Sequence, residues 1–138
     1  RSFVSYIAIA VRVRVLGRKM WIEQVDLAID CGLAVHPERI RSQMEGSVVF
    51  GISLAMMGKA TMKKGAVEQS NFHDAPVARI TDAKPKINVS LIQSDAPPGG
   101  VGEPGVPPFA PALCNALFAA TGKRIRSLPI NEYDLAEA

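Results

Sequence analysis

Alternation of apolar and other side chains over residues 3–15 is the feature that most constrains the fold of this chain. A period of two places every second side chain on one face of a β-strand, so the pattern predicts a strand with one wet face. Residues 20–29 repeat the pattern after a turn at 16–19, which predicts an antiparallel hairpin. The apolar face of the first strand is expected to carry Phe3, Ile7, Ile9, Val11, Val13 and Val15.

A helix is predicted over about residues 37–57. Pro37 suits its first turn, and the helix is expected to end before Gly58. Its second half is apolar all round, so we expect that half to be buried on several sides. Gly46 and Gly51 lower its helix propensity and indicate close packing against a neighbour or a ligand. Its core face is expected to carry Ile40, Met44, Val48 and Ile52, which recur at four-residue spacing.

The rest of the chain predicts a second helix and one more clear strand. Residues 86–92 alternate like a strand, and a second helix is expected from Pro107 and Pro108 to about residue 121, with Gly122 as its cap. Residues 59–85 give mixed signals, with a turn at Lys64–Gly65 and a polar stretch that suits a surface. The second helix is expected to bury Phe109, Leu113, Leu117 and Ala120.

These elements predict an α+β fold with a mixed or antiparallel sheet and two main helices. A length of 138 residues suits a single domain, and 48% hydrophobic residues are enough to bury a core. The sequence begins at Arg1 rather than at a methionine, so we expect residues 1–138 to be a single domain or a fragment of a longer chain.

Composition argues against several classes of function. The net charge is only +3, and the basic residues are scattered with few aromatics between them, which is a poor footprint for nucleic acid. No apolar run is long enough to span a bilayer. Cys31 and Cys114 are expected to be free thiols, and an iron–sulfur cluster needs about four thiolates. His36 and His73 lack partners at metal-ligand spacing, so no metal site is predicted from this chain's own side chains.

Residues 99–108, GGVGEPGVPP, place one acidic residue among glycines and prolines. Glycines let a backbone approach a ligand closely, and prolines restrict the motion of a loop. A carboxylate on a stiff loop with few side chains is typical of a positioned general base, so Glu103 is the candidate catalytic residue. A plain Gly/Pro turn explains the same composition equally well.

Three separated segments resemble one known family in the correct order. Residues 100–129, which include Gly102–Gly105, resemble the C-terminal signature of the large subunits of molybdenum hydroxylases, the xanthine dehydrogenase and aldehyde oxidase relatives. Residues 30–51 resemble the family segment in which a helix carries a Gln-x-Glu-Gly element, here 43–46. Residues 67–80 are similar to the isoquinoline oxidoreductase branch in particular.

The resemblance implies a fragment of a molybdopterin-binding domain in a hydroxylase that adds water-derived oxygen to an N-heterocycle or an aldehyde. It implies a molybdenum–molybdopterin cofactor, in the cytosine dinucleotide form, and iron–sulfur clusters on a separate small [2Fe–2S] subunit. The remainder of the large subunit is the other expected partner, and periplasm and cytoplasm both stay open as compartments. By resemblance, the catalytic base is Glu103, and the cofactor-binding residues are Gln43, Gly99, Gly100, Val101 and Gly102.

A non-catalytic alternative remains open at this stage. A glycine-rich loop before a helix that starts at Pro107 could hold a phosphate by itself, in a stand-alone module that binds a nucleotide or a partner subunit. Without the resemblance, Gln43 would be interpreted as an exposed helix residue or as one that makes a hydrogen bond within the chain.

Overall fold

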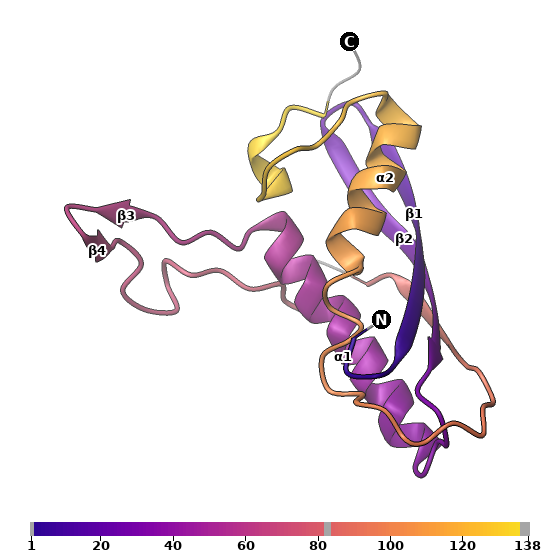
Figure 1. Ribbon diagram of the computed structural model, residues 1–138. Coiled ribbons are helices and arrows are strands. Elements are labelled where there is room, and N and C mark those ends of the chain that lie inside the picture. Colours follow the sequence, from indigo (N-terminus) through magenta and orange to yellow (C-terminus); the bar gives the residue numbers. More distant parts are fainter. Residues whose placement is uncertain (1, 82–83, 136–138) are drawn as a thin grey trace.

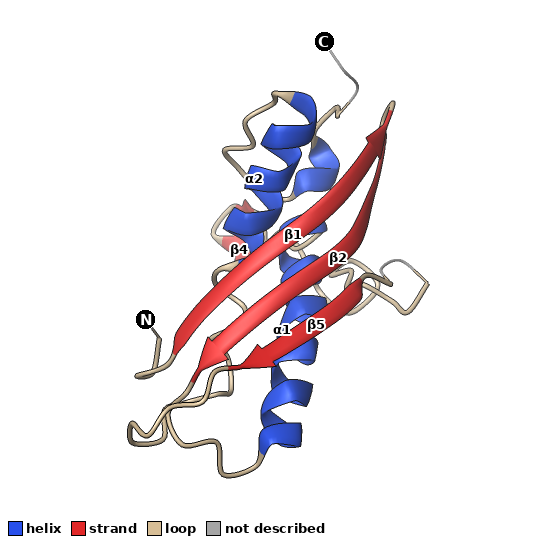
Figure 2. Cartoon of the chain, turned by 90° about the vertical axis from the view of Figure 1, so that its right-hand side faces the viewer, coloured by secondary structure: helices blue, strands red, loops and turns tan. Residues whose placement is uncertain are grey.

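A three-stranded mixed sheet organises the structure, a computed structural model that describes residues 2–81 and 84–135. Its strands are β1 (Tyr6–Leu16), β2 (Lys19–Asp30) and β5 (Lys86–Leu91), in the order β1–β2–β5. The first two form the predicted antiparallel hairpin, and β5 pairs with β2 in parallel, from Gln24 opposite Lys86 to Ile29 opposite Leu91. The predicted α+β class with a mixed sheet and two helices is therefore confirmed (Figure 2).

Both helices cover one face of this sheet. Helix α1 (Pro37–Met56) connects β2 to β5, because parallel neighbours need a long crossover that a hairpin turn cannot supply. Helix α2 (Phe109–Thr121) follows the loop after β5 and ends at Gly122, whose φ of 70° forms a left-handed cap. Figure 2 shows α2 behind β1, and α1 behind β5. A short 3₁₀ turn, η1 (Ile130–Glu132), also packs against the core, through the buried Ile130.

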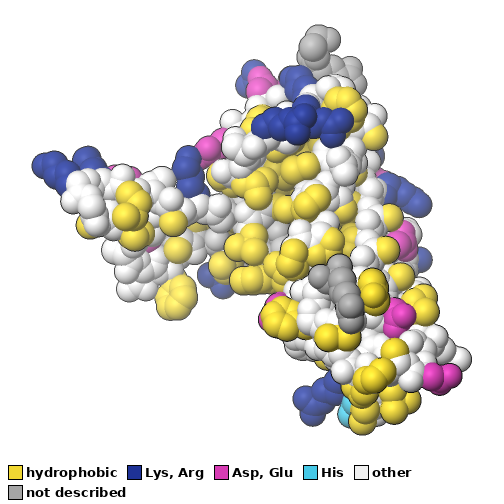
Figure 3. All heavy atoms as spheres, in the orientation of Figure 1, with side chains coloured by type: hydrophobic (Ala, Val, Ile, Leu, Met, Phe, Trp, Pro, Cys, Tyr) yellow, Lys and Arg dark blue, Asp and Glu magenta, His cyan; other side chains and the backbone are white. Residues whose placement is uncertain are grey.

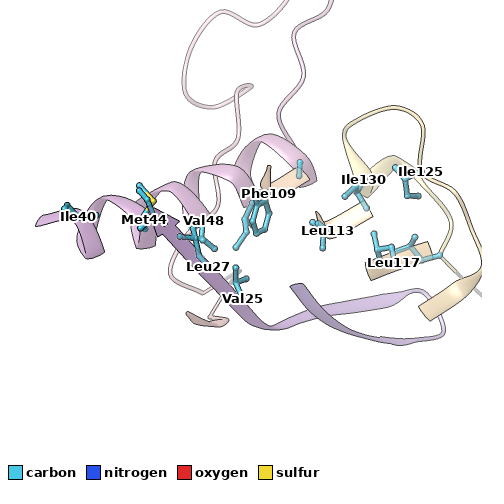
Figure 4. Packing of buried hydrophobic residues seen from close by; sticks show 14 of the residues in the cluster. Val25, Leu27, Ile40, Met44, Val48, Phe109, Leu113, Leu117, Ile125 and Ile130 are labelled. Atoms are coloured by element: carbon cyan, nitrogen blue, oxygen red, sulfur yellow. The ribbon is translucent and has the colours of Figure 1, made fainter. Parts of the chain in front are cut away.

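The core lies between the sheet and the two helices (Figure 4). The predicted alternation places one face of β1 and β2 inward, and the four-residue spacing of α1 places its apolar stripe against them. Burial of each such side chain contributes about 1.5–3 kcal/mol. The best-buried members are Val25, Leu27, Ile29, Met44, Val48, Phe109, Leu113, Leu117 and Ile130.

The prediction for the start of the first strand was wrong. The strand begins at Tyr6 rather than at residue 3, and Phe3 is 61% exposed rather than on the core face. Phe3 and Val4 have φ values of 49° and 71°, a left-handed conformation that a strand cannot contain and that is rare for β-branched residues. The chain therefore turns sharply just before β1, and an isolated bridge joins Ser2 to Ser5.

Two expected burials were also wrong. Ala120 is exposed at the last turn of α2. On the second half of α1, Val49, Phe50 and Leu54 keep 43%, 56% and 43% of their surface exposed, so that half is not buried on several sides. Figure 3 shows hydrophobic side chains gathered on the face where α1 and α2 lie.

Residues between α1 and β5 form an arm that extends away from the sheet (Figure 1). Its tip is a small hairpin of β3 (Met62–Lys63) and β4 (Ala66–Val67), with the predicted turn at Lys64 and Gly65. The polar stretch over 67–80 belongs to this arm, and its residues are exposed or half-buried, as expected for a surface segment. Part of its return path, residues 82–83, lies outside the described residues. No helix among the described residues is long and apolar enough to cross a membrane.

The two glycines inside α1 differ in the space around them. A Cβ on Gly51 would lie 2.8 Å from ring atoms of Phe109, whereas a Cβ on Gly46 would meet nothing within 4 Å. Gly51 therefore allows α2 to begin directly against α1, as the sequence predicted for close packing. Gly46 has no packing requirement within the described residues.

We expect alanine at these two positions to change stability in opposite directions. Gly51→Ala should lower the free energy of unfolding by about 1–3 kcal/mol, because the buried Phe109 ring cannot move aside. Gly46→Ala should raise it by about 0.5–1 kcal/mol through helix propensity alone. Urea unfolding of the two variants checks this, and equal effects would contradict the packing described for Gly51.

Candidate functional site

The loop between β5 and α2 carries Glu103 and is fixed to the end of β2. The backbone N–H of Leu33 donates to the Ala96 carbonyl at 2.9 Å, and the N–H of Gly99 donates to the Cys31 carbonyl at 2.7 Å. Gly32, with φ of 70°, lies so close to Pro97 that a Cβ would be 2.3 Å from its carbonyl oxygen. The first half of the loop is therefore positioned by the parallel ends of β2 and β5.

The glycine stretch is fixed further by the turn before β1. The N–H of Gly100 donates to the Phe3 carbonyl at 2.8 Å, and Ser5 Oγ donates to the Gly100 carbonyl at 2.7 Å. The N–H groups of Gly99 and Gly100 are thus used within the chain. For Val101 and Gly102, no partner of the backbone N–H occurs among the described residues.

Gln43 and the glycine loop lie together, as the resemblance implies. Gln43 is on the exposed side of the first half of α1, and its Nε2 donates to the Gly102 carbonyl at 3.3 Å. The two residues are 59 positions apart in the sequence. Helix α1 begins at Pro37 with His36 as its cap, whose Nδ1 accepts from the Arg39 N–H at 3.3 Å, and this start determines where Gln43 falls along the helix.

Glu103 lies next to this contact and faces outward. Its residue is exposed, and within the described part of the chain its carboxylate has neither a hydrogen bond nor an ion pair. Its backbone is fixed, because its carbonyl accepts from the Val106 N–H at 3.0 Å and the following Pro104 and Gly105 are buried. The side chain is therefore free to contact something outside the chain while its Cα stays in place.

Packing within the chain explains three of the loop glycines. A Cβ on Gly99 would lie 2.5 Å from Ser5 Oγ, one on Gly100 would lie 2.7 Å from the Phe3 Cβ, and one on Gly105 would lie 2.1 Å from Ser47 Oγ. Gly102 differs, because its Cβ position is open and its φ is not left-handed. The plain Gly/Pro turn thus accounts for most of the loop but not for Gly102.

Cys31 and Cys114 are free thiols, as the sequence predicted, and Cys31 is the more deeply buried of the two. Burial raises the pKa of both thiols. No group of three or more His, Cys, Asp or Glu side chains that could hold a metal ion occurs in the described part of the chain.

A hollow of about 660 Å³ lies elsewhere, at the C-terminal end of α1, and is lined by residues that include Trp21, Met56 and Met57. Gln43 lies 13 residues before Met56 on the helix, a separation of about 20 Å. The candidate site is the Gln43–Glu103 surface rather than this hollow, because that surface combines a carboxylate, an amide and open backbone donors.

Ser5 was not predicted as a site residue, yet it is fully buried and joined to the glycine loop. One signal was present. Ser5 occupies an odd position, on the same face as Ile7 and Ile9, so it is a polar residue in an apolar row. Buried hydroxyls are expected to have partners, and such an interruption marks a side chain whose partner lies elsewhere in the chain.

Comparison with known proteins identifies the family of this chain. The family model described as a molybdopterin cofactor-binding domain matches residues 2–84. The isoquinoline 1-oxidoreductase subunit beta of Brevundimonas diminuta is 38% identical over 109 residues, 79% of this chain and 14% of its own length. One subunit of a probable xanthine dehydrogenase from Bacillus subtilis (strain 168) is 31% identical over 135 residues, 95% of this chain and 18% of its own length.

Solved structures share the fold. Quinoline 2-oxidoreductase from Pseudomonas putida 86 superposes with a TM-score of 0.66 at 19% identity, over 81% of this chain and 15% of that one. Taken with the sequence matches, these similarities confirm the resemblance to molybdenum hydroxylase large subunits. The chain belongs to the family of molybdopterin cofactor-binding domains. It spans about 14% of the length of the first curated relatives that it matches.

We expect the two loop glycines on either side of Glu103 to respond differently to alanine. Gly105→Ala should lower the free energy of unfolding by about 1–3 kcal/mol, because its Cβ would overlap Ser47. Gly102→Ala should change it by no more than about 0.5 kcal/mol, because the space is open. Thermal and urea unfolding of both variants measure the difference, and a large loss for Gly102→Ala would show that the position is occupied within the chain.

Proposed function

We propose that this chain is the part of a molybdenum hydroxylase catalytic subunit that carries the general base, Glu103. The observation that supports this most is that Gln43, Gly102 and Glu103, three residues that the family resemblance selects, share one surface. A hydrogen bond of 3.3 Å joins the Gln43 amide to the Gly102 carbonyl, and Glu103 is the next residue in the chain. None of the three is required there by the packing of the chain itself. Their shared surface therefore suits a ligand that the described residues do not supply.

The groups at this surface suit a molybdopterin cofactor. The Gln43 amide offers donors and an acceptor, and the N–H groups of Val101 and Gly102 have no partner among the described residues. The open space at Gly102 lets a bound group approach the backbone. We infer that Gln43, Val101 and Gly102 contact the cofactor, and that Gly99 and Gly100 contribute by shaping the loop, since their own N–H groups are used within the chain.

When bound, this cofactor supplies the oxidising power that converts a C–H group into a C–OH group with oxygen from water. That conversion releases protons, and a carboxylate accepts one when it lies within hydrogen-bond reach of the reacting group. Glu103 provides such a carboxylate on a backbone fixed at Val106. The substrate proposed is an N-heterocycle or an aldehyde.

The partners follow from what this chain lacks. Two separate thiols cannot hold an iron–sulfur cluster, so the electrons are proposed to leave through a small [2Fe–2S] subunit. We propose the cytosine dinucleotide form of the cofactor, and the remainder of a large subunit as the other part of its binding site.

The non-catalytic alternative has weaker support. Pro107, Pro108 and Pro111 carry no backbone N–H, and the N–H of Phe109 donates to the Val106 carbonyl. Among the described residues, the start of α2 therefore leaves the Ala110 N–H as its one open amide donor, whereas phosphates at helix N-termini are held by several. A stand-alone nucleotide-binding module is disfavoured by this arrangement.

Cofactor content tests the proposal directly. The protein purified from its source with its native partners should contain about one molybdenum per chain and release one cytosine nucleotide on denaturation. Metal analysis and chromatography of the released nucleotide measure both. Folded protein that contains neither, from cells that make the cofactor, would overturn the proposed function.

Replacement of the proposed base should affect turnover and leave the cofactor in place. Glu103→Gln keeps the size of the side chain and should lower kcat about 10²–10⁴-fold with unchanged molybdenum content. Glu45→Gln is the matched control, because Glu45 is also exposed and lies near Gln43 on α1. Steady-state assays with isoquinoline, nicotinate and benzaldehyde as probes would make the comparison, and normal turnover of Glu103→Gln would contradict the role.

A further inference from the structure

The turn before β1 makes an unusual contact with the loop that carries Glu103. Two residues of this turn, Phe3 and Ser5, lie against two consecutive glycines, Gly99 and Gly100. Both backbone polar groups of Gly100 are hydrogen-bonded to this turn. Its N–H donates to the Phe3 carbonyl at 2.8 Å, and its carbonyl accepts from Ser5 Oγ at 2.7 Å. The contact joins residues 95 positions apart.

The geometry of this contact is tight on both sides. Ser5 is fully buried, so its hydroxyl would lose its hydrogen bond without access to water if the loop moved. Side chains at positions 99 and 100 would overlap Ser5 Oγ and the Phe3 Cβ. These close contacts therefore fit one position of the loop relative to the turn before β1.

The turn is also strained. Phe3 and Val4 both adopt left-handed φ values, and such residues each cost about 1–3 kcal/mol, a cost that the surrounding contacts must offset. Strain of this kind persists where the surrounding structure holds it. Here two backbone hydrogen bonds between Ser2 and Ser5 close the turn, and the Phe3 carbonyl accepts from the Gly100 N–H. An ordinary strand start at residue 3 would avoid the strain and would also remove the Phe3 carbonyl from Gly100.

We propose that Ser5 is a positioning residue, which acts through the Gly100 carbonyl to hold the loop of Glu103 in its working place. Only two residues separate Gly100 from Glu103, and Val101 and Gly102 between them have no backbone N–H partner among the described residues. The Ser5 hydroxyl is thus the last buried side-chain anchor before the base on that side, since the Gln43 amide that reaches the Gly102 carbonyl is exposed. On the other side the buried Pro104 and Gly105 hold the loop.

The inference rests on the proposed function, and it separates into two measurable parts. The first is that Ser5 holds the loop, which the 138-residue chain can show without any cofactor. The second is that the held loop serves the reaction, which only the complete molybdenum enzyme can show.

Amide hydrogen exchange tests the first part. In the unmodified chain, the N–H groups of Gly99 and Gly100 should exchange slowly, and those of Val101 and Gly102 should exchange fast. In Ser5→Ala, the exchange of Gly99 and Gly100 should become about tenfold faster than in the unmodified chain. Fast exchange at Gly100 in the unmodified chain would overturn the proposal without the need for a variant that folds.

Ser53→Ala is the matched control. Ser53 is also a buried serine with two hydrogen bonds, to the Val49 carbonyl at 3.3 Å and from the Ala78 N–H at 3.0 Å, but it holds the arm rather than the glycine loop. It loses the same hydroxyl and should leave exchange at Gly99 and Gly100 unchanged. Equal acceleration in both variants would show a general loss of stability and would overturn the specific role of Ser5.

Kinetics of the complete enzyme test the second part. Ser5→Ala should lower kcat about tenfold with KM and molybdenum content near those of the unmodified enzyme, because a displaced base affects the reaction more than binding. Ser53→Ala should leave kcat unchanged. An unchanged kcat in Ser5→Ala, with a loop that exchanges faster, would overturn the role in the reaction. If the unmodified protein holds no molybdenum, the proposed function fails with that role, and the exchange data still decide whether Ser5 holds the loop.

Discussion

The contact between the Phe109 ring and Gly51 determines where the second helix begins, and much of the structure depends on it. Phe109 is fully buried and starts α2, so its position against α1 fixes the end of the loop that carries Glu103. A larger side chain at position 51 would separate the helices at their closest approach. Helix α1 thus positions two parts of the candidate site. Gln43 lies on the exposed side of the helix, and the loop ends at Phe109 on its buried side.

The other end of the loop depends on the parallel pairing of β2 and β5. Both strands end at the same edge of the sheet, so the segments that follow them run side by side from Cys31 and Ile92. Hydrogen bonds between these segments hold the loop as far as Gly99. The loop of Glu103 is therefore fixed at both ends by elements that belong to the core, which suits the proposed role of Glu103 as a base that is held within hydrogen-bond reach of a substrate.

Periodicity in the sequence predicted the elements well, because alternation and four-residue spacing report which face of each element is buried. It could not predict that β5 pairs with β2 in parallel, since alternation carries no information on strand order or direction. It failed at Phe3, where left-handed backbone angles end the strand that the pattern extended. The proximity of Gln43 and Gly102 came from the family resemblance, because no local pattern links residues 59 positions apart.

The exposure of Glu103 bears on how the proposed chemistry would be divided between this chain and its surroundings. A carboxylate in water interacts weakly with neighbouring charges, because the high dielectric constant of water screens them. Its electrostatic interactions with a bound group become stronger when water is excluded from the site. Nothing among the described residues covers Glu103, so the chain provides the position of the carboxylate and leaves the dry surroundings to other components. The relatives it matches are several times longer, and the proposed cofactor and the rest of a large subunit would supply that cover. On this view the tight anchoring by Ser5, Pro104 and Gly105 has a physical reason: a base presented to an outside surface has no neighbours of its own to orient it, so the backbone alone must do so.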